Sequence, residues 1–264
     1  MGRDGYPQRV RRRIDDERFP EWRPFTEAVQ RRRPDAGTWC EAWTVRDIVA
    51  HQAGNAEELA RVLGAHLRGE PVGTRGFAER EDPLRALSDA DLWDALHDRM
   101  AALDEVAAAA EGVSADTDVA WTGRTMKVPW FAEHMREELV LHGWDITGDS
   151  DLRVGAPLAE PWMTSHSVVA VGRPLLAKGA ERLRPGERIE ARLRVRNTDD
   201  VAISADAEHT TIAMAGPEGP ATLETDAAAR VLLLWGRRPG DPSRICSDAG
   251  PEILGRVRRL LSGY

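Results

Sequence analysis

The spacing of apolar residues changes once along this chain of 264 residues, near residue 150. Before that point apolar residues recur at steps of three and four, the period of an amphipathic helix. Beyond it, residues 187–196 alternate apolar and charged side chains, the period of a half-buried strand. The length favours about two domains. We therefore expect an α+β chain with a helical domain in residues 1–150 and a smaller α+β domain in residues 151–264.

Four helices are expected in the first domain, at about residues 15–33, 44–63, 88–110 and 128–146. The second opens with Thr44-Val45-Arg46-Asp47, which matches a capping box, in which the threonine oxygen and the aspartate carboxylate accept backbone amide protons. A long connection around residues 69–83 separates the second helix from the third. Four helices of this length favour a bundle.

The second domain is expected to mix short strands with helices. The pattern predicts strands at 187–196, 201–204 and 210–214, and helices at 162–178, 225–235 and 252–261.

The charge balance bears on possible partners. The chain has 36 basic and 44 acidic residues, a net charge of -8, which argues against a nucleic-acid binder and favours a small-molecule ligand. No apolar run approaches the ~20 residues that cross a bilayer. Two cysteines are too few for a disulfide framework, and the charged N-terminus lacks the apolar stretch of a secretory leader. We expect a cytoplasmic monomer or homodimer without nucleic-acid or membrane partners.

Chemistry-bearing side chains occur on two of the expected helices. Glu138 and His142 are four residues apart, so they lie one turn apart on one helix face, and Asp145 follows three residues later. His51 lies on a mostly apolar face of the second helix. Together His51, Glu138 and His142 offer two nitrogens and one oxygen. This is a common catalytic zinc set, which leaves the fourth tetrahedral position open.

Spacing alone leaves other interpretations open. A Glu and a His at this spacing more often form a solvated pair, and a single His on an apolar face is more often a satisfied core group. His134 lies four residues before Glu138 on the same face and is an alternative ligand.

Three segments carry a family resemblance. Residues 39–51 (WCEAWTVRDIVAH) resemble the opening motif of the mycothiol-dependent maleylpyruvate isomerase family. Residues 138–146 (ELVLHGWDI) resemble its second signature, and residues 233–237 (LLWGR) resemble a motif of its C-terminal domain. The three occur in the family's order across nearly the whole chain.

The resemblance implies a DinB-like four-helix bundle followed by a smaller α+β domain related to sterol-carrier folds. It also implies a divalent metal, usually zinc, held by His51, Glu138 and His142, and mycothiol as the thiol cofactor or co-substrate. The arginine bias of the basic residues, of which only Lys127 and Lys178 are lysine, is typical of a high-GC, actinobacterium-like source, and mycothiol is an actinobacterial thiol.

The implied activity is nucleophilic. A metal-bound thiolate would add to an electrophilic small molecule, and the adduct would either release a trans isomer or remain as an S-transfer product. Two alternatives stay open: a non-catalytic metal- or thiol-binding module, and a hydrolase that uses zinc-bound water at the same site.

Three further residues receive roles by resemblance or position. Arg237, and with less support Arg80 in the long connection, are expected to bind the thiol or an anionic substrate; the alternative for both is an exposed surface arginine. Asp145 is expected to accept a hydrogen bond from a metal-bound imidazole, or else to cap its helix.

Overall fold

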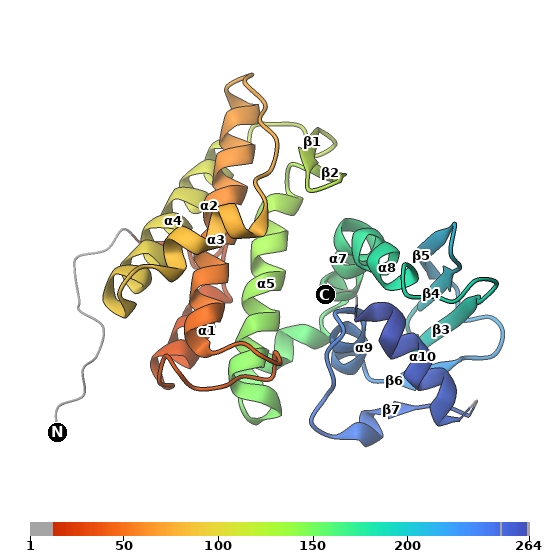
Figure 1. Cartoon of the computed structure of the whole chain (residues 1–264). Coiled ribbons are helices and arrows are strands. Elements are labelled where there is room, and N and C mark those ends of the chain that lie inside the picture. Colours follow the sequence, from red (N-terminus) through yellow and green to blue (C-terminus); the bar gives the residue numbers. More distant parts are fainter. Residues whose placement is uncertain (1–12, 249, 263–264) are drawn as a thin grey trace. The chain divides into compact units, whose positions relative to one another are not determined.

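The computed structural model describes residues 13–248 and 250–262, which divide into two compact units after Thr147 (Figure 1). The first unit is mainly helical and the second contains the larger sheet, which confirms the α+β class. Residues 1–12, where the sequence predicts no secretory leader, lie outside the described residues.

The first unit is built around three long helices, α2, α4 and α5, and the shorter α1. Its elements are α1 (Trp22–Gln30), α2 (Val45–Leu67), α3 (Phe77–Arg85), α4 (Asp89–Ala109), β1 (Asp118–Trp121), β2 (Arg124–Lys127) and α5 (Trp130–Thr147). Helix α2 packs against α4 and α5, and α1 packs against α5 (Figure 1). The expected bundle is confirmed, with α1, α2, α4 and α5 as its members.

Helix α2 forms the centre of this bundle. It is buried along most of its length, with Ile48 and Leu59 fully inaccessible, and Leu96 of α4 and Phe131 of α5 are buried as well. Each such side chain stabilises the fold by about 1.5–3 kcal/mol through burial. The core therefore fixes α2 against α5, the two helices that carry the expected ligands.

Two predictions for the first unit were wrong. The first helix begins at Trp22 and not near residue 15, because Pro20 disfavours helical geometry at the residue before it. The predicted connection 69–83 contains part of a helix, α3, which packs on α2. The β1–β2 hairpin was not predicted.

The second unit is a five-stranded sheet with helices. Its elements are α6 (Leu152–Gly155), α7 (Pro161–His166), a π-helical turn (Ser167–Val171), α8 (Gly172–Ala180), β3 (Ile189–Val195), β4 (Asp200–Ala205), β5 (Thr210–Ala215), β6 (Leu223–Thr225), α9 (Ala227–Leu234), β7 (Ile245–Cys246) and α10 (Pro251–Leu261), with short 3-10 turns at Gly148–Ser150, Ala156–Ala159 and Pro242–Arg244. The strand order is β5-β4-β3-β6-β7, and β3 pairs with β6 in parallel whereas the other pairs are antiparallel.

Strand β3 follows the predicted alternation. Its apolar residues are buried, and Arg192 and Arg194 on the other face both pair with Asp200 of β4, at 3.0 and 2.7 Å. The segment predicted as one helix, 162–178, is interrupted by the π-helical turn between α7 and α8.

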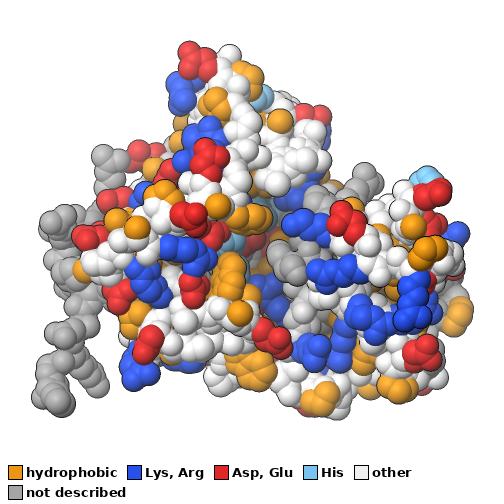
Figure 2. All heavy atoms as spheres, in the orientation of Figure 1, with side chains coloured by type: hydrophobic (Ala, Val, Ile, Leu, Met, Phe, Trp, Pro, Cys, Tyr) orange, Lys and Arg blue, Asp and Glu red, His pale blue; other side chains and the backbone are white. Residues whose placement is uncertain are grey.

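No described helix is both long and apolar enough to span a membrane. Figure 2 shows acidic and basic side chains interspersed over the first unit on the face that it draws. That face of the unit shows no continuous basic surface of the kind that tracks a phosphate backbone.

Candidate metal centre

The N-terminus of α2 is fixed by the capping box expected from the sequence. Thr44 Oγ1 accepts from the backbone N–H of Asp47 at 3.2 Å, and Asp47 Oδ2 accepts from the backbone N–H of Thr44 at 2.9 Å. Each bond satisfies an amide that would otherwise lack a partner at the helix end. The cap sets the start of α2, and His51 follows within the next two turns, 8% exposed.

Helix α5 brings the other two expected ligands together. Glu138 and His142 lie one turn apart, and Glu138 Oε2 is 3.3 Å from the Nε2 atom of His142. The same oxygen is 3.3 Å from the Nε2 atom of His51 across the bundle. One ligand atom from each residue lies within 4.8 Å of the other two, and all three side chains are buried. The structure thus places the three sequence-predicted ligands side by side.

Each histidine presents its other ring nitrogen to a carboxylate. His142 Nδ1 is 2.9 Å from Asp145 Oδ2, and His51 Nδ1 is 2.7 Å from Glu81 Oε1. Asp145 is fully buried on α5, and Glu81 is buried on α3. Metal-binding histidines commonly donate their second N–H to a carboxylate in this way. Asp145 lies within ion-pair distance of His142 Nδ1, but that nitrogen has no hydrogen-bond partner among the described residues, so the role of Asp145 stays a prediction.

The carboxylates also set the protonation of the site. Burial disfavours the charged imidazole of His51, but hydrogen bonds to Glu138 and Glu81 outweigh burial and raise its pKa to about 9. Burial likewise favours a neutral Glu138, but His142 and His51 hold the pKa of that carboxyl well below its usual range. Three buried carboxylates therefore share two imidazoles.

This donor set fits a divalent cation. Two ligand atoms of a tetrahedral zinc ion, each ~2.0–2.1 Å from the metal, lie roughly 3.3 Å apart. The two histidine Nε2 atoms each lie 3.3 Å from Glu138 Oε2, which matches that separation. Two neutral imidazoles and a carboxylate are ligands that zinc commonly takes. Gln52, fully buried, donates from Nε2 to the same oxygen at 3.4 Å, while its Oε1 atom has no hydrogen-bond partner among the described residues.

Aromatic side chains surround the two histidines. The Trp43 indole lies parallel to the His142 ring, with centroids 5.7 Å apart, and meets the His51 ring edge-on at 5.0 Å. Phe77, from α3, stacks on His51 with centroids 6.1 Å apart and is 52% exposed. The imidazoles are therefore restrained by packing as well as by hydrogen bonds.

Arg80 is buried beside this group, on α3 and not in an irregular connection as predicted. Its guanidinium lies over the Phe77 ring at 4.5 Å and donates to Asn55 Oδ1 at 3.4 Å. Its Nε atom is buried without a hydrogen-bond partner among the described residues. Glu58, Glu81 and Glu138 are the carboxylates whose charge acts on it. The alternative of an exposed surface arginine is wrong.

His134, the alternative ligand, lies near the same carboxylate but on its other side. Its Nε2 atom is 3.8 Å from Glu138 Oε1, whereas His51 and His142 approach Oε2. The geometry favours the set of His51, Glu138 and His142.

Residues 17–147 match the family model of the mycothiol maleylpyruvate isomerase N-terminal domain. Through this domain, the chain belongs to the mycothiol maleylpyruvate isomerase family. No curated protein matches the chain.

Two solved structures are similar to this family member. They are crystal structures of the mycothiol-dependent maleylpyruvate isomerase and of a variant of it with a histidine replaced by alanine. Each has a TM-score of 0.60 and 17% identity, and each alignment covers 89% of this chain and 93% of the other. At that identity the likeness shows a shared fold, and it extends over both units.

Arg237, the remaining residue for which a binding role was predicted, lies in the second unit. It follows α9 and Gly236, is half-buried, and donates from Nη1 to the carbonyl of Trp235 at 3.1 Å. Its expected role in binding the co-substrate stays a prediction.

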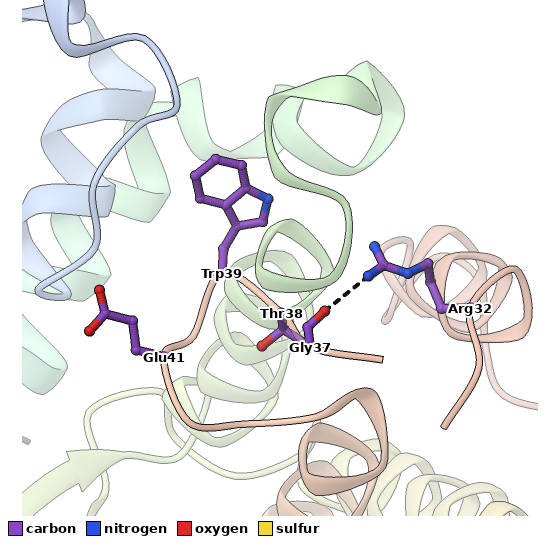
Figure 3. Close-up of a pocket in the computed structure, with 5 residues that line it drawn as sticks. All are labelled: Arg32, Gly37, Thr38, Trp39 and Glu41. Carbon is purple, nitrogen blue, oxygen red and sulfur yellow. Dashed lines mark hydrogen bonds between the residues drawn. The ribbon is translucent and has the colours of Figure 1, made fainter. Parts of the chain in front are cut away.

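A separate pocket lies in the first unit of this chain. It has a volume of about 320 Å³ and is lined by Arg32, Gly37, Thr38, Trp39 and Glu41 (Figure 3). Arg32 donates to the Gly37 carbonyl at 2.9 Å and thereby closes the base of the loop that carries the half-exposed Trp39. None of the lining residues is an expected ligand.

Sequence reasoning missed several residues that contact the histidines, chiefly Glu81 and Phe77. The sequence did contain a signal for a helix here: the spacing of residues 77, 80, 81 and 84 places four side chains on one helix face. Two of the four are charged, so the hydrophobic pattern did not reveal a buried face.

Proposed function

We propose that this family member is a metal-dependent enzyme that uses mycothiol as its thiol co-substrate. The proposed reaction is S-transfer to an electrophilic small molecule, or addition and elimination that isomerises one. The observation that carries the proposal is the approach of two imidazole nitrogens to a single oxygen of Glu138 at 3.3 Å, with carboxylates behind both rings. Family membership supports mycothiol as the thiol.

His51, Glu138 and His142 would hold the metal, which is zinc or another divalent ion. When bound, the ion would favour the thiolate form of a coordinated thiol near neutral pH. Asp145 would accept the Nδ1 proton of His142 and keep Nε2 available as a ligand. Trp43 and Phe77 would keep water away from the imidazole faces that they cover.

Arg80 would bind an anionic group of the thiol or of the electrophile. Its Nε has no hydrogen-bond partner among the described residues, and a planar guanidinium is suited to a carboxylate because it offers parallel donors. Arg237 is proposed to contribute a second cation. A reducing cytoplasm would suit a thiol co-substrate.

Titration of mycothiol into the zinc-loaded and the metal-stripped chain tests this function. We expect heat of binding and release of a proton only with the loaded chain, and turnover of an electrophile such as maleylpyruvate. Binding without turnover of any electrophile would favour the non-catalytic module. Zinc binding without a response to mycothiol would contradict the proposal and favour a hydrolase.

A further inference from the structure

Helix α3 approaches α2 closely at one glycine. A Cβ atom at Gly54 would lie 3.4 Å from the backbone oxygen of Arg80 and 3.4 Å from Cγ of Glu81. These are the shortest separations that real Cβ contacts ordinarily show, so a residue larger than alanine would push α3 away. A residue no larger than alanine at position 54 therefore allows α3 to bring the carboxylate of Glu81 to within 2.7 Å of His51 Nδ1.

The second oxygen of Glu81 is held from its other side. Arg85, one turn later on α3, donates to Glu81 Oε2 at 2.9 Å. The same guanidinium pairs with Asp47 Oδ1. Asp47 Oδ2 in turn accepts from the hydroxyl and the backbone N–H of Thr44, at 2.6 and 2.9 Å. An unbroken run of hydrogen bonds therefore joins the cap of α2 to the ring of His51.

Each ring nitrogen of His51 faces a carboxylate oxygen. Nδ1 lies 2.7 Å from Glu81 Oε1, and Nε2 lies 3.3 Å from Glu138 Oε2. A carboxylate oxygen can accept a hydrogen bond, and Arg85 occupies the other oxygen of Glu81. With a metal ion between Nε2 and Glu138, the one proton of a neutral His51 would lie on Nδ1, where Glu81 would accept it.

We propose that Glu81 is a positioning residue that selects the metal-binding nitrogen of His51, and that Arg85 holds Glu81 in place for this purpose. The inference rests on the proposed metal centre. It distinguishes the two histidines: the carboxylate nearest His142 Nδ1, that of Asp145, lies on the same helix, whereas the carboxylate at His51 Nδ1 depends on the docking of α3. A disturbance of α3 would weaken metal binding through His51 and leave His142 in place.

The test measures the zinc affinity of the full chain by competition with a chromogenic chelator. Glu81→Ala is expected to lower the affinity by about 10- to 100-fold, the cost of removing such a hydrogen-bond partner of a metal-binding histidine. Glu81→Gln keeps an acceptor oxygen for Nδ1–H and is expected to retain most of the affinity. The matched control, Glu79→Ala, changes an exposed carboxylate on the same helix and is expected to have no effect.

A second readout separates orientation from stability. In the zinc-loaded, ¹⁵N-labelled chain, the Nδ1–H proton of His51 should exchange slowly with water in the wild type and in Glu81→Gln, and quickly in Glu81→Ala and Arg85→Ala. The Nδ1–H proton of His142 should be unchanged in all four. A general loss of stability would speed exchange at both histidines, so an effect confined to His51 marks a loss of its orientation.

Wild-type affinity in Glu81→Ala, or an equally protected His51 Nδ1–H in that variant, would overturn this inference while the metal centre stands. A wild-type chain that binds no zinc would instead overturn the proposed function. The two failures are therefore distinguishable.

Discussion

The indole of Trp43 lies parallel to the imidazole of His142, with ring centroids 5.7 Å apart and planes 4° apart. The same indole packs edge-on against His51 at 5.0 Å, so one side chain from the loop before α2 restrains both metal-site histidines. The guanidinium carbon of Arg85 lies over the Trp43 ring, 5.9 Å from its centroid. Packing against Trp43 therefore restrains the side-chain rotamers of two expected ligands that lie on different helices.

Trp43→Ala should therefore loosen both imidazoles and lower zinc affinity by about tenfold, within the range for outer partners of a metal site. Trp43→Phe keeps a flat ring and should retain most of the affinity. Chelator competition measures both variants, and Trp162→Ala in the second unit is the control. Equal losses in Trp43→Ala and Trp43→Phe would show that ring packing is not the cause.

Asp145→Ala should weaken metal binding through His142. The substitution removes the acceptor that lies 2.9 Å from Nδ1, while the backbone hydrogen bond from Trp39 N–H to the Asp145 carbonyl, 2.7 Å, does not depend on the side chain. We expect a loss of about 10- to 100-fold in zinc affinity, measured by the same competition. An unchanged affinity would leave Asp145 with a structural role only.

Arg80→Gln should weaken binding of mycothiol or of an anionic electrophile by about 10- to 100-fold, the range expected when a charge-assisted hydrogen bond is lost. Zinc content should be unchanged, because Arg80 is not a ligand. Arg80→Lys should rescue binding only in part, because an ammonium lacks the planar pair of donors. Calorimetry on the zinc-loaded chain measures ligand binding in each variant. A variant that lost zinc as well as ligand binding would contradict the role assigned to Arg80.

Glu58 provides a pH-dependent stability effect outside the metal centre. Its buried carboxylate joins α2 to the connection before α3: Oε1 accepts from the Arg75 backbone N–H at 2.6 Å and Oε2 from Arg75 Nε at 2.7 Å, and Arg61 donates to Oε1 at 2.6 Å. Burial raises the pKa of Glu58, but the hydrogen bonds from Arg61 and Arg75 outweigh burial and lower it to about 2 from the ordinary 4.5.

A lowered pKa in the folded state means that these contacts stabilise the fold above pH 4.5 and that the contribution fades as pH falls toward about 2. Glu58→Gln should accordingly lower the free energy of unfolding by about 2 kcal/mol at pH 7. The difference from wild type should shrink below pH 4.5, as measured by urea denaturation across pH. Glu70→Gln, an exposed carboxylate in the same connection, is the control. A difference independent of pH would contradict this account.

The parts of the fold and site that sequence predicts are those set by local periodicity. Thr44 and Asp47 mark the start of α2 by a four-residue pattern, and Glu138 and His142 share a face because of helix geometry. The alternation in β3 likewise reports a buried face directly. These features need no knowledge of distant contacts.

The remaining features depend on contacts between segments far apart in the chain. Glu81 lies 30 residues from His51, and its role becomes visible only once α3 is docked at Gly54. Charged residues on the buried face of α3 are stabilised by partners on α2. Because these residues are not apolar, the hydropathy pattern predicted a connection where the structure has a helix. The hairpin of β1 and β2 was missed for a related reason: each strand has only four residues, too short for a clear alternation.

We propose that His51, Glu138 and His142 hold one divalent ion. Elemental analysis of the purified full chain, after loading with zinc and removal of excess metal, measures it most directly when wild type is compared with His142→Ala and with Glu79→Ala. We expect about one zinc per chain in wild type and Glu79→Ala, and a loss of zinc in His142→Ala. Equal zinc content in wild type and His142→Ala would contradict it.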